Sequence, residues 1–219
     1  MPYVATSICI LILLSLPAGV ASFLYMLLRT INVRIEPIVT YAITLVLLIA
    51  MALFVNHNLF DWLSHLGLAS AKLYFIPLHV LVATLFGILV YVTNMILARH
   101  TYLSSRLCKL CISVDMLRSM NFWIILLIAA LEELVFRALL IGLFNDLYNN
   151  YMFSLVACTI FYALNHLIYT PKIALFKLFD GAIYTIALVL TGTIITPMIA
   201  HITYNLMTLL IRYKCGGSS

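Results

Sequence analysis

Charged residues are scarce in this chain. Asp, Glu, Lys and Arg make up 9% of its 219 residues, whereas hydrophobic residues make up 65% and the mean hydropathy is +1.17. Soluble domains carry about 25% charged residues, so the composition excludes a soluble globular protein and predicts an integral membrane protein. The formal charge of +5 reflects Lys and Arg in loops. Such loop charge reports orientation in a membrane and does not indicate nucleic-acid binding.

The chain also lacks a disulfide framework and any internal repeat. Its five cysteines are an odd count, and Cys108 and Cys111 form a lone CxxC in a basic loop. One such pair without a second is weak evidence for zinc. We therefore interpret the cysteines as reduced thiols and expect no cofactor.

Apolar runs predict an all-α, polytopic transmembrane helix bundle. A spanning helix needs about 20 apolar residues, so a chain of this length holds six to eight spans. The runs predict seven helices, at residues 4–28, 37–55, 73–97, 121–144, 151–169, 174–190 and 193–212. The mixed segment 56–70 contains Trp62, which favours the depth of lipid headgroups, and is predicted to be an interfacial helix or re-entrant piece.

Three regions follow from this pattern, all within one structural domain. They are N-terminal transmembrane helices with a basic cytoplasmic loop at 1–120, a catalytic core at 121–212, and a tail at 213–219. Ten Lys and Arg residues, Lys177 among them, fall after the odd-numbered helices, and Lys72 alone falls on the other side. The positive-inside rule then predicts a multi-pass protein with its N-terminus outside and its C-terminus in the cytoplasm.

Two adjacent glutamates lie in the middle of an apolar stretch, at Glu132 and Glu133. Placing a charge at the bilayer centre costs about 2.5–3.5 kcal/mol, so intramembrane acids indicate function. Glu133 and Arg137 have the i,i+4 spacing of a helical ion pair, with the acid first as is favoured. Glu132 points about 100° away around the helix and lacks this partner. Its position favours a role as a general base.

Two further helices carry polar side chains that could meet these glutamates. On a helix, residues i and i+4 share a face, which pairs Tyr162 with His166 and His201 with Asn205. At a rise of about 1.5 Å per residue, Glu132 and His201 lie at similar depths, and His166 lies nearer the cytoplasm. The sequence therefore predicts a cavity open to the cytoplasm. Within it we expect a carboxylate base, a histidine beside it, and His and Asn donors that stabilise an oxyanion.

Three short motifs resemble those of the CAAX-protease and bacteriocin-processing family, also called CPBP or Abi. They are EExxxR at 132–137, FxxxH at 162–166 with Tyr in place of Phe, and HxxxN at 201–205. Their order and spacing agree with the family over about residues 121–209. The N-terminal hundred residues match it only in being hydrophobic.

The resemblance implies an intramembrane glutamate endopeptidase. The implied catalytic residues are Glu132 as the base that activates water, His166 as the residue that helps to position it, and His201 with Asn205 as the oxyanion hole. Glu133, Arg137 and Tyr162 would support the site. Some branches of the family remove the last three residues of prenylated CAAX proteins, and bacterial branches process bacteriocins or quorum-sensing precursors, or confer immunity. The short chain favours a bacterial plasma-membrane protein that acts on a membrane-bound peptide, lipidated or not.

Three alternatives stay open at this point. Two glutamates and two histidines could hold a divalent metal in a metalloprotease, since catalytic zinc uses three protein ligands, although the HExxH spacing is absent. The motif residues could instead stabilise a non-enzymatic immunity factor or scaffold. A proton-coupled transporter would also use buried acids, but duplicated broken helices are not evident.

Overall fold

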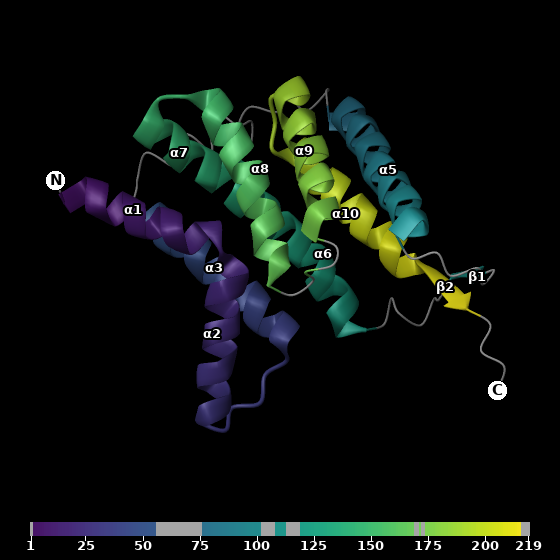
Figure 1. Cartoon of the computed structure of the whole chain (residues 1–219), viewed down its shortest axis with the longest axis horizontal. Coiled ribbons are helices and arrows are strands. Elements are labelled where there is room, and N and C mark those ends of the chain that lie inside the picture. Colours follow the sequence, from purple (N-terminus) through teal and green to yellow (C-terminus); the bar gives the residue numbers. More distant parts are fainter. Residues whose placement is uncertain are drawn as a thin grey trace.

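Helices form nearly all of this computed structural model, which describes residues 2–55, 76–101, 108–112, 119–168, 171 and 174–215 (Figure 1). The elements in chain order are α1 (Pro2–Ser15), α2 (Pro17–Thr30), α3 (Pro37–Val55), α5 (Ile76–Thr101), β1 (Cys108–Ile112), α6 (Met120–Glu133), a π-helix η4 (Leu134–Leu139), α7 (Leu140–Tyr148), α8 (Tyr151–Leu167), α9 (Ala174–Thr191), α10 (Ile195–Leu210) and β2 (Ile211–Cys215). The predicted interfacial segment 56–70 lies outside the described residues.

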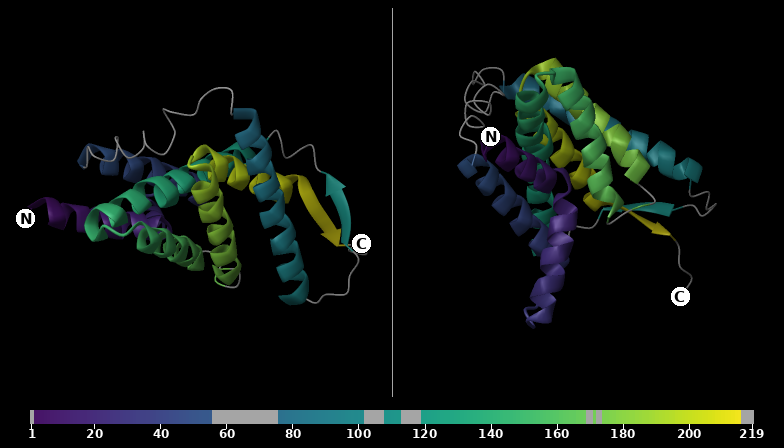
Figure 2. Two further views of the ribbon diagram at one scale, coloured as in Figure 1. Left: turned by 90° about the horizontal axis from the view of Figure 1, so that it is seen from above. Right: turned by 60° about the vertical axis from the view of Figure 1, so that its left-hand side comes forward.

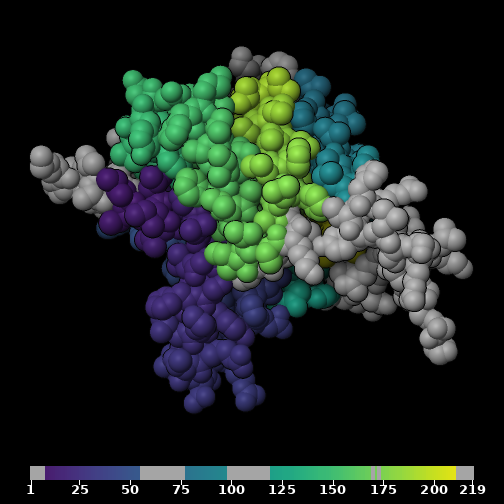
Figure 3. Space-filling view, in the orientation of Figure 1, coloured from purple at the N-terminus to yellow at the C-terminus, as the bar shows by residue number. Residues whose placement is uncertain are grey.

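The predicted first span, 4–28, is broken into two helices. α1 and α2 meet at an angle of 80° at Leu16. Pro17 is the physical reason, because its ring removes a backbone donor and clashes with the carbonyl one turn earlier, while suiting the first position of a new helix. The new helix α2 turns away from α1 and packs against α3, and it extends to the bottom of the molecule in the view of Figures 1 and 3.

Three of the described helices are long and apolar enough to cross a membrane, namely α3, α5 and α9, and the bent pair α1–α2 would make a fourth. Large apolar side chains face outward along two of them, such as Val46 and Leu47 on α3 and Leu81 and Leu85 on α5. Such outward apolar surfaces suit contact with lipid. The chain is thus an integral membrane protein, and the count of seven spans stays a prediction.

The glutamate-bearing helix α6 lies among the others rather than at the edge. It contacts α3 on one side and α10 on another, and α10 in turn packs along α5 (Figure 2). α5 and α10 approach closely at Gly87, where a Cβ would lie 2.6 Å from the Ala200 carbonyl oxygen. The segment that carries the polar motifs is therefore enclosed by apolar helices.

Short turns connect the helices that carry the motifs. Gly192, with φ of +65°, follows α9 and lets the chain turn into α10. Asn149 adopts φ of 47° after α7, and the Asn150 side chain then accepts a hydrogen bond from the Phe153 amide as the N-cap of α8. Asn suits both positions, because it tolerates left-handed φ and caps helix N-termini.

A two-stranded antiparallel sheet departs from the all-α prediction. β1 lies in the segment expected to be a basic loop, and it pairs with β2 so that Cys108 is opposite Cys215. The last helix therefore ends at Leu210 rather than at the predicted residue 212. This pairing holds β1 beside the strand that directly follows α10.

Candidate active site

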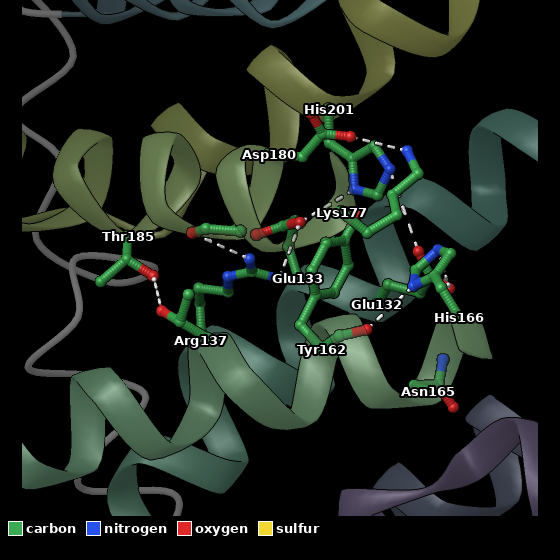
Figure 4. Close-up of polar contacts among 12 residues, drawn as sticks. Glu132, Glu133, Arg137, Tyr162, Asn165, His166, Lys177, Asp180, Thr185 and His201 are labelled. Atoms are coloured by element: carbon green, nitrogen blue, oxygen red, sulfur yellow. Dashed lines mark hydrogen bonds and ion pairs between the residues drawn. The ribbon is translucent and has the colours of Figure 1, made fainter. Parts of the chain in front are cut away.

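Glu132, His166 and His201 point toward one another from α6, α8 and α10 (Figure 4). His166 Nε2 lies 4.0 Å from Glu132 Oε1, and His201 Nε2 lies 3.9 Å from Glu132 Oε2. Glu132 is only 4% exposed, so its carboxylate faces the protein and not lipid. The three predicted side chains therefore meet, with one imidazole beside each carboxylate oxygen.

The ring of His166 has a defined orientation. Its Nδ1 lies 2.9 Å from the backbone carbonyl oxygen of Tyr162, one turn earlier on α8. Since a carbonyl oxygen only accepts, Nδ1 carries the proton and donates it. In the neutral ring, Nε2 is then a bare acceptor directed at Glu132.

Glu133 occupies a separate, fully enclosed position. Its Oε1 lies 2.8 Å from His201 Nδ1, within hydrogen-bond distance, and accepts a hydrogen bond of 3.3 Å from Arg137 Nη1. Glu133 and Arg137 are both completely buried. The i,i+4 ion pair expected from the sequence thus forms, and His201 contacts both glutamates, one through each ring nitrogen.

Arg137 is held by three different kinds of contact. Besides the ion pair, its Nη2 donates to the Gly181 carbonyl oxygen at 3.2 Å, and its guanidinium lies 4.2 Å from the centre of the Tyr162 ring. A Cβ on Gly181 would lie 3.3 Å from Arg137 Nη2 and 3.0 Å from Tyr162 Cδ1, so glycine permits this approach. Arg137 lies in the π-helix η4, a form that occurs mostly as a local distortion at functional sites.

The sequence interpretation missed one partner of Glu132. Tyr41 on α3 donates its hydroxyl proton to Glu132 Oε1 at 2.6 Å, and Asn165 Nδ2 donates to the Tyr41 oxygen at 2.9 Å. Glu132 therefore does have a partner, and Asn165, which bonds to Tyr41, is also buried. A weak signal existed, because Tyr41 lies between Thr40 and Thr44 in an otherwise apolar run.

Lys177 also differs from its predicted place. It was counted with the cytoplasmic loop charges, but it lies in α9, where its Nζ forms a 2.8 Å ion pair with Asp180. Asn94 Nδ2 donates to the other Asp180 oxygen at 2.6 Å. The i,i+3 spacing of Lys177 and Asp180 was the signal that could have placed both side chains on one helix face.

Asn205 lies one turn beyond His201 on α10 and is half-buried. Within the described part of the chain, no hydrogen bond or ion pair joins Asn205 to Glu132, His166 or His201. Over the same residues, no group of three or more His, Cys, Asp or Glu side chains is arranged to hold a metal ion.

Comparison with known proteins adds one finding. Residues 116–207 match the family described as type II CAAX prenyl endopeptidase Rce1-like, and this segment contains all three motifs. No curated protein and no solved structure matches the chain. Residues 116–207 are thus similar to the CAAX-protease family, and the match covers the part of the chain that carries the site.

Proposed function

We propose that this protein is an intramembrane endopeptidase in which Glu132 activates water to hydrolyse a peptide bond. The observation that carries the proposal is the placement of two imidazole nitrogens 3.9–4.0 Å from the two Glu132 oxygens. These separations are too long for direct hydrogen bonds. Two hydrogen bonds of about 2.8 Å that meet at one water oxygen span about 4–5 Å, so a water fits between the carboxylate and an imidazole.

The reaction follows from these positions. Glu132 takes a proton from the water, the resulting hydroxide attacks the carbonyl carbon of the peptide bond, and an oxyanion forms. When the C–N bond breaks, the proton passes to the leaving amine. His166, whose unprotonated Nε2 faces Glu132, orients the attacking water.

The oxyanion hole is proposed from His201 and Asn205. The ring nitrogen of His201 that faces Glu132 is Nε2, and it donates to an oxyanion in the tautomer that carries the ring proton there. The Asn205 amide supplies a second donor on the same helix face.

The substrate proposed is a membrane-associated peptide or protein, including one with a prenylated cysteine near its C-terminus. The family description carries the prenyl part of this proposal. A bacterial peptide precursor in the plasma membrane is the second source of such a substrate, with the active site open to the cytoplasm.

The test uses the purified full chain in lipid vesicles with three peptides, each read by mass spectrometry. One ends in a prenylated cysteine followed by three residues, one is its unprenylated twin, and one is a membrane-bound precursor with a leader. We expect cleavage of at least one peptide, and a fall of about 100- to 10,000-fold in Glu132→Gln. Glu36→Gln is the matched control, because Glu36 is exposed outside α3.

Three results would contradict the proposal. Full cleavage by Glu132→Gln would remove the carboxylate from the mechanism. Loss of cleavage on chelation, restored by zinc, would favour the metalloprotease. A biological effect of the protein that survives Glu132→Gln while no peptide is cleaved would instead support the non-enzymatic scaffold.

A further inference from the structure

A chain of hydrogen bonds links four helices and ends at Glu132 on α6. The Ala18 amide of α2 donates to Asn165 Oδ1 at 2.7 Å, Asn165 Nδ2 donates to the Tyr41 hydroxyl at 2.9 Å, and Tyr41 donates to Glu132 Oε1 at 2.6 Å. All three bonds are buried. We call Ala18, Asn165 and Tyr41 the Tyr41 relay.

The Ala18 backbone amide, at the end of the relay away from Glu132, fixes the direction of every hydrogen bond in it. A backbone N–H can only donate, so the Ala18 amide makes Asn165 Oδ1 an acceptor. The other end of the Asn165 amide is then its NH₂ group, which can only donate, and Tyr41 receives that bond on its oxygen. The single Tyr41 proton is left for Glu132, whose Oε1 must accept it.

The bend between α1 and α2 supplies the starting point. The first N–H groups of a helix lack a carbonyl one turn earlier to bond to. Pro17 starts a new helix at the bend, and the Ala18 amide one residue later is directed at α8 rather than along α1. The helix break at Pro17 therefore lets the Ala18 amide bond to Asn165, which lies 147 residues after Ala18 in the chain.

We infer that Tyr41 is a positioning residue for Glu132, and that the relay holds Oε1 as an acceptor so that Oε2 stays available to water. This inference rests on the proposed peptidase function. A hydrogen bond to a charged group contributes about 1.5–3 kcal/mol, and an ionised carboxylate is the form that accepts such a bond. Tyr41 and Ala18 lie outside the matched segment 116–207, so the N-terminal helices complete the site.

Two nearly isosteric variants test the relay. Tyr41→Phe removes the donor to Glu132. Asn165→Asp keeps the acceptor for Ala18 but replaces the NH₂ donor by an oxygen, so that Tyr41 can donate to residue 165 and away from Glu132. For each variant we expect kcat to fall about 10- to 100-fold, with KM unchanged, on whichever peptide the wild-type protein cleaves.

The double variant and a control make the test specific. Residues that act through one chain give non-additive losses, so Tyr41→Phe with Asn165→Asp should lose no more than the worse single variant. Tyr148→Phe removes a hydroxyl from an exposed tyrosine on α7 and should keep full kcat. Equal kcat in wild type and Tyr41→Phe, or losses that multiply in the double variant, would overturn the inference.

A second readout needs no substrate. The infrared carboxylate band that disappears in Glu132→Gln should shift in Tyr41→Phe, because the carboxylate loses a short hydrogen bond. An unshifted band would overturn the relay even in a protein that cleaves peptides. Failure of the wild type to cleave any peptide would instead refute the proposed function, and the shifted band would still establish the contact. Should Tyr41→Phe fail to fold, Asn165→Asp carries both measurements.

Discussion

The surroundings of Glu132 and those of Glu133 differ sharply, although the two residues are adjacent in one helix. Glu133 has no exposed surface and contacts a guanidinium and an imidazole, whereas Glu132 keeps slight exposure and receives its short hydrogen bond from a neutral tyrosine. A buried carboxylate with a cationic partner is fixed as part of the structure. In the proposed mechanism, Glu132, which is held by a neutral donor at the edge of the buried region, keeps a basic oxygen for chemistry. The partner, and not the residue type, then divides the two proposed roles.

The largest expected effect is that of Glu133→Gln on stability. Removing one member of a buried ion pair leaves the Arg137 charge uncompensated, and we expect the free energy of unfolding to fall by about 3–5 kcal/mol. Unfolding in mixed detergents would measure it. Glu132→Gln is the matched control, because its amide oxygen can still accept the Tyr41 proton. Equal destabilisation by the two variants would mean that the two environments do not differ in the way described.

A second test separates the two histidines. His166 lies beside Glu132 and its side chain is 18% exposed, whereas His201 also contacts Glu133 and is almost fully buried. We expect His166→Gln to lower kcat by about 100-fold with little change in the unfolding midpoint. His201→Gln should lower both kcat and the unfolding midpoint. Measuring peptide cleavage and thermal unfolding on the same samples checks this. A His166→Gln variant that is destabilised but cleaves the peptide as fast as the wild type would contradict this division between the two histidines.

Local spacing predicted the parts of the site that depend on one helix. The Glu133–Arg137 pair follows from i,i+4 geometry, and the apolar runs around the motifs predicted most helices to within a few residues. The π-helix at Arg137 left this pair intact although it altered the backbone around it. Helical periodicity alone was enough for these features, because their energetics are local.

Features that depend on tertiary packing could not be predicted in the same way. Tyr41 meets Glu132 across 91 residues, and nothing in the sequence near either residue specifies that contact. Lys177 looked like a loop cation, and the Asn94 amide that bonds to its partner Asp180 comes into place only when α5 packs on α9. The bend at Pro17 was hidden by a continuous apolar run. Charge counting and hydropathy do not register such contacts, since both ignore which helices are neighbours.

The smallest expected effect concerns Tyr162, where the family motif has Phe. Its ring lies under the Arg137 guanidinium, but its hydroxyl is buried and has no hydrogen-bond partner among the described residues. An unsatisfied buried polar group costs about 1–3 kcal/mol, and Phe keeps the ring that Arg137 stacks on. Tyr162→Phe should therefore leave the unfolding free energy unchanged or raise it by up to about 1 kcal/mol, as unfolding in mixed detergents would show. Tyr162→Leu is the control, because it removes the ring as well and should destabilise the Arg137 cluster. A clear loss of stability in Tyr162→Phe would show that the hydroxyl is bonded, and the charged cluster around Glu133 would then extend further than the described contacts indicate.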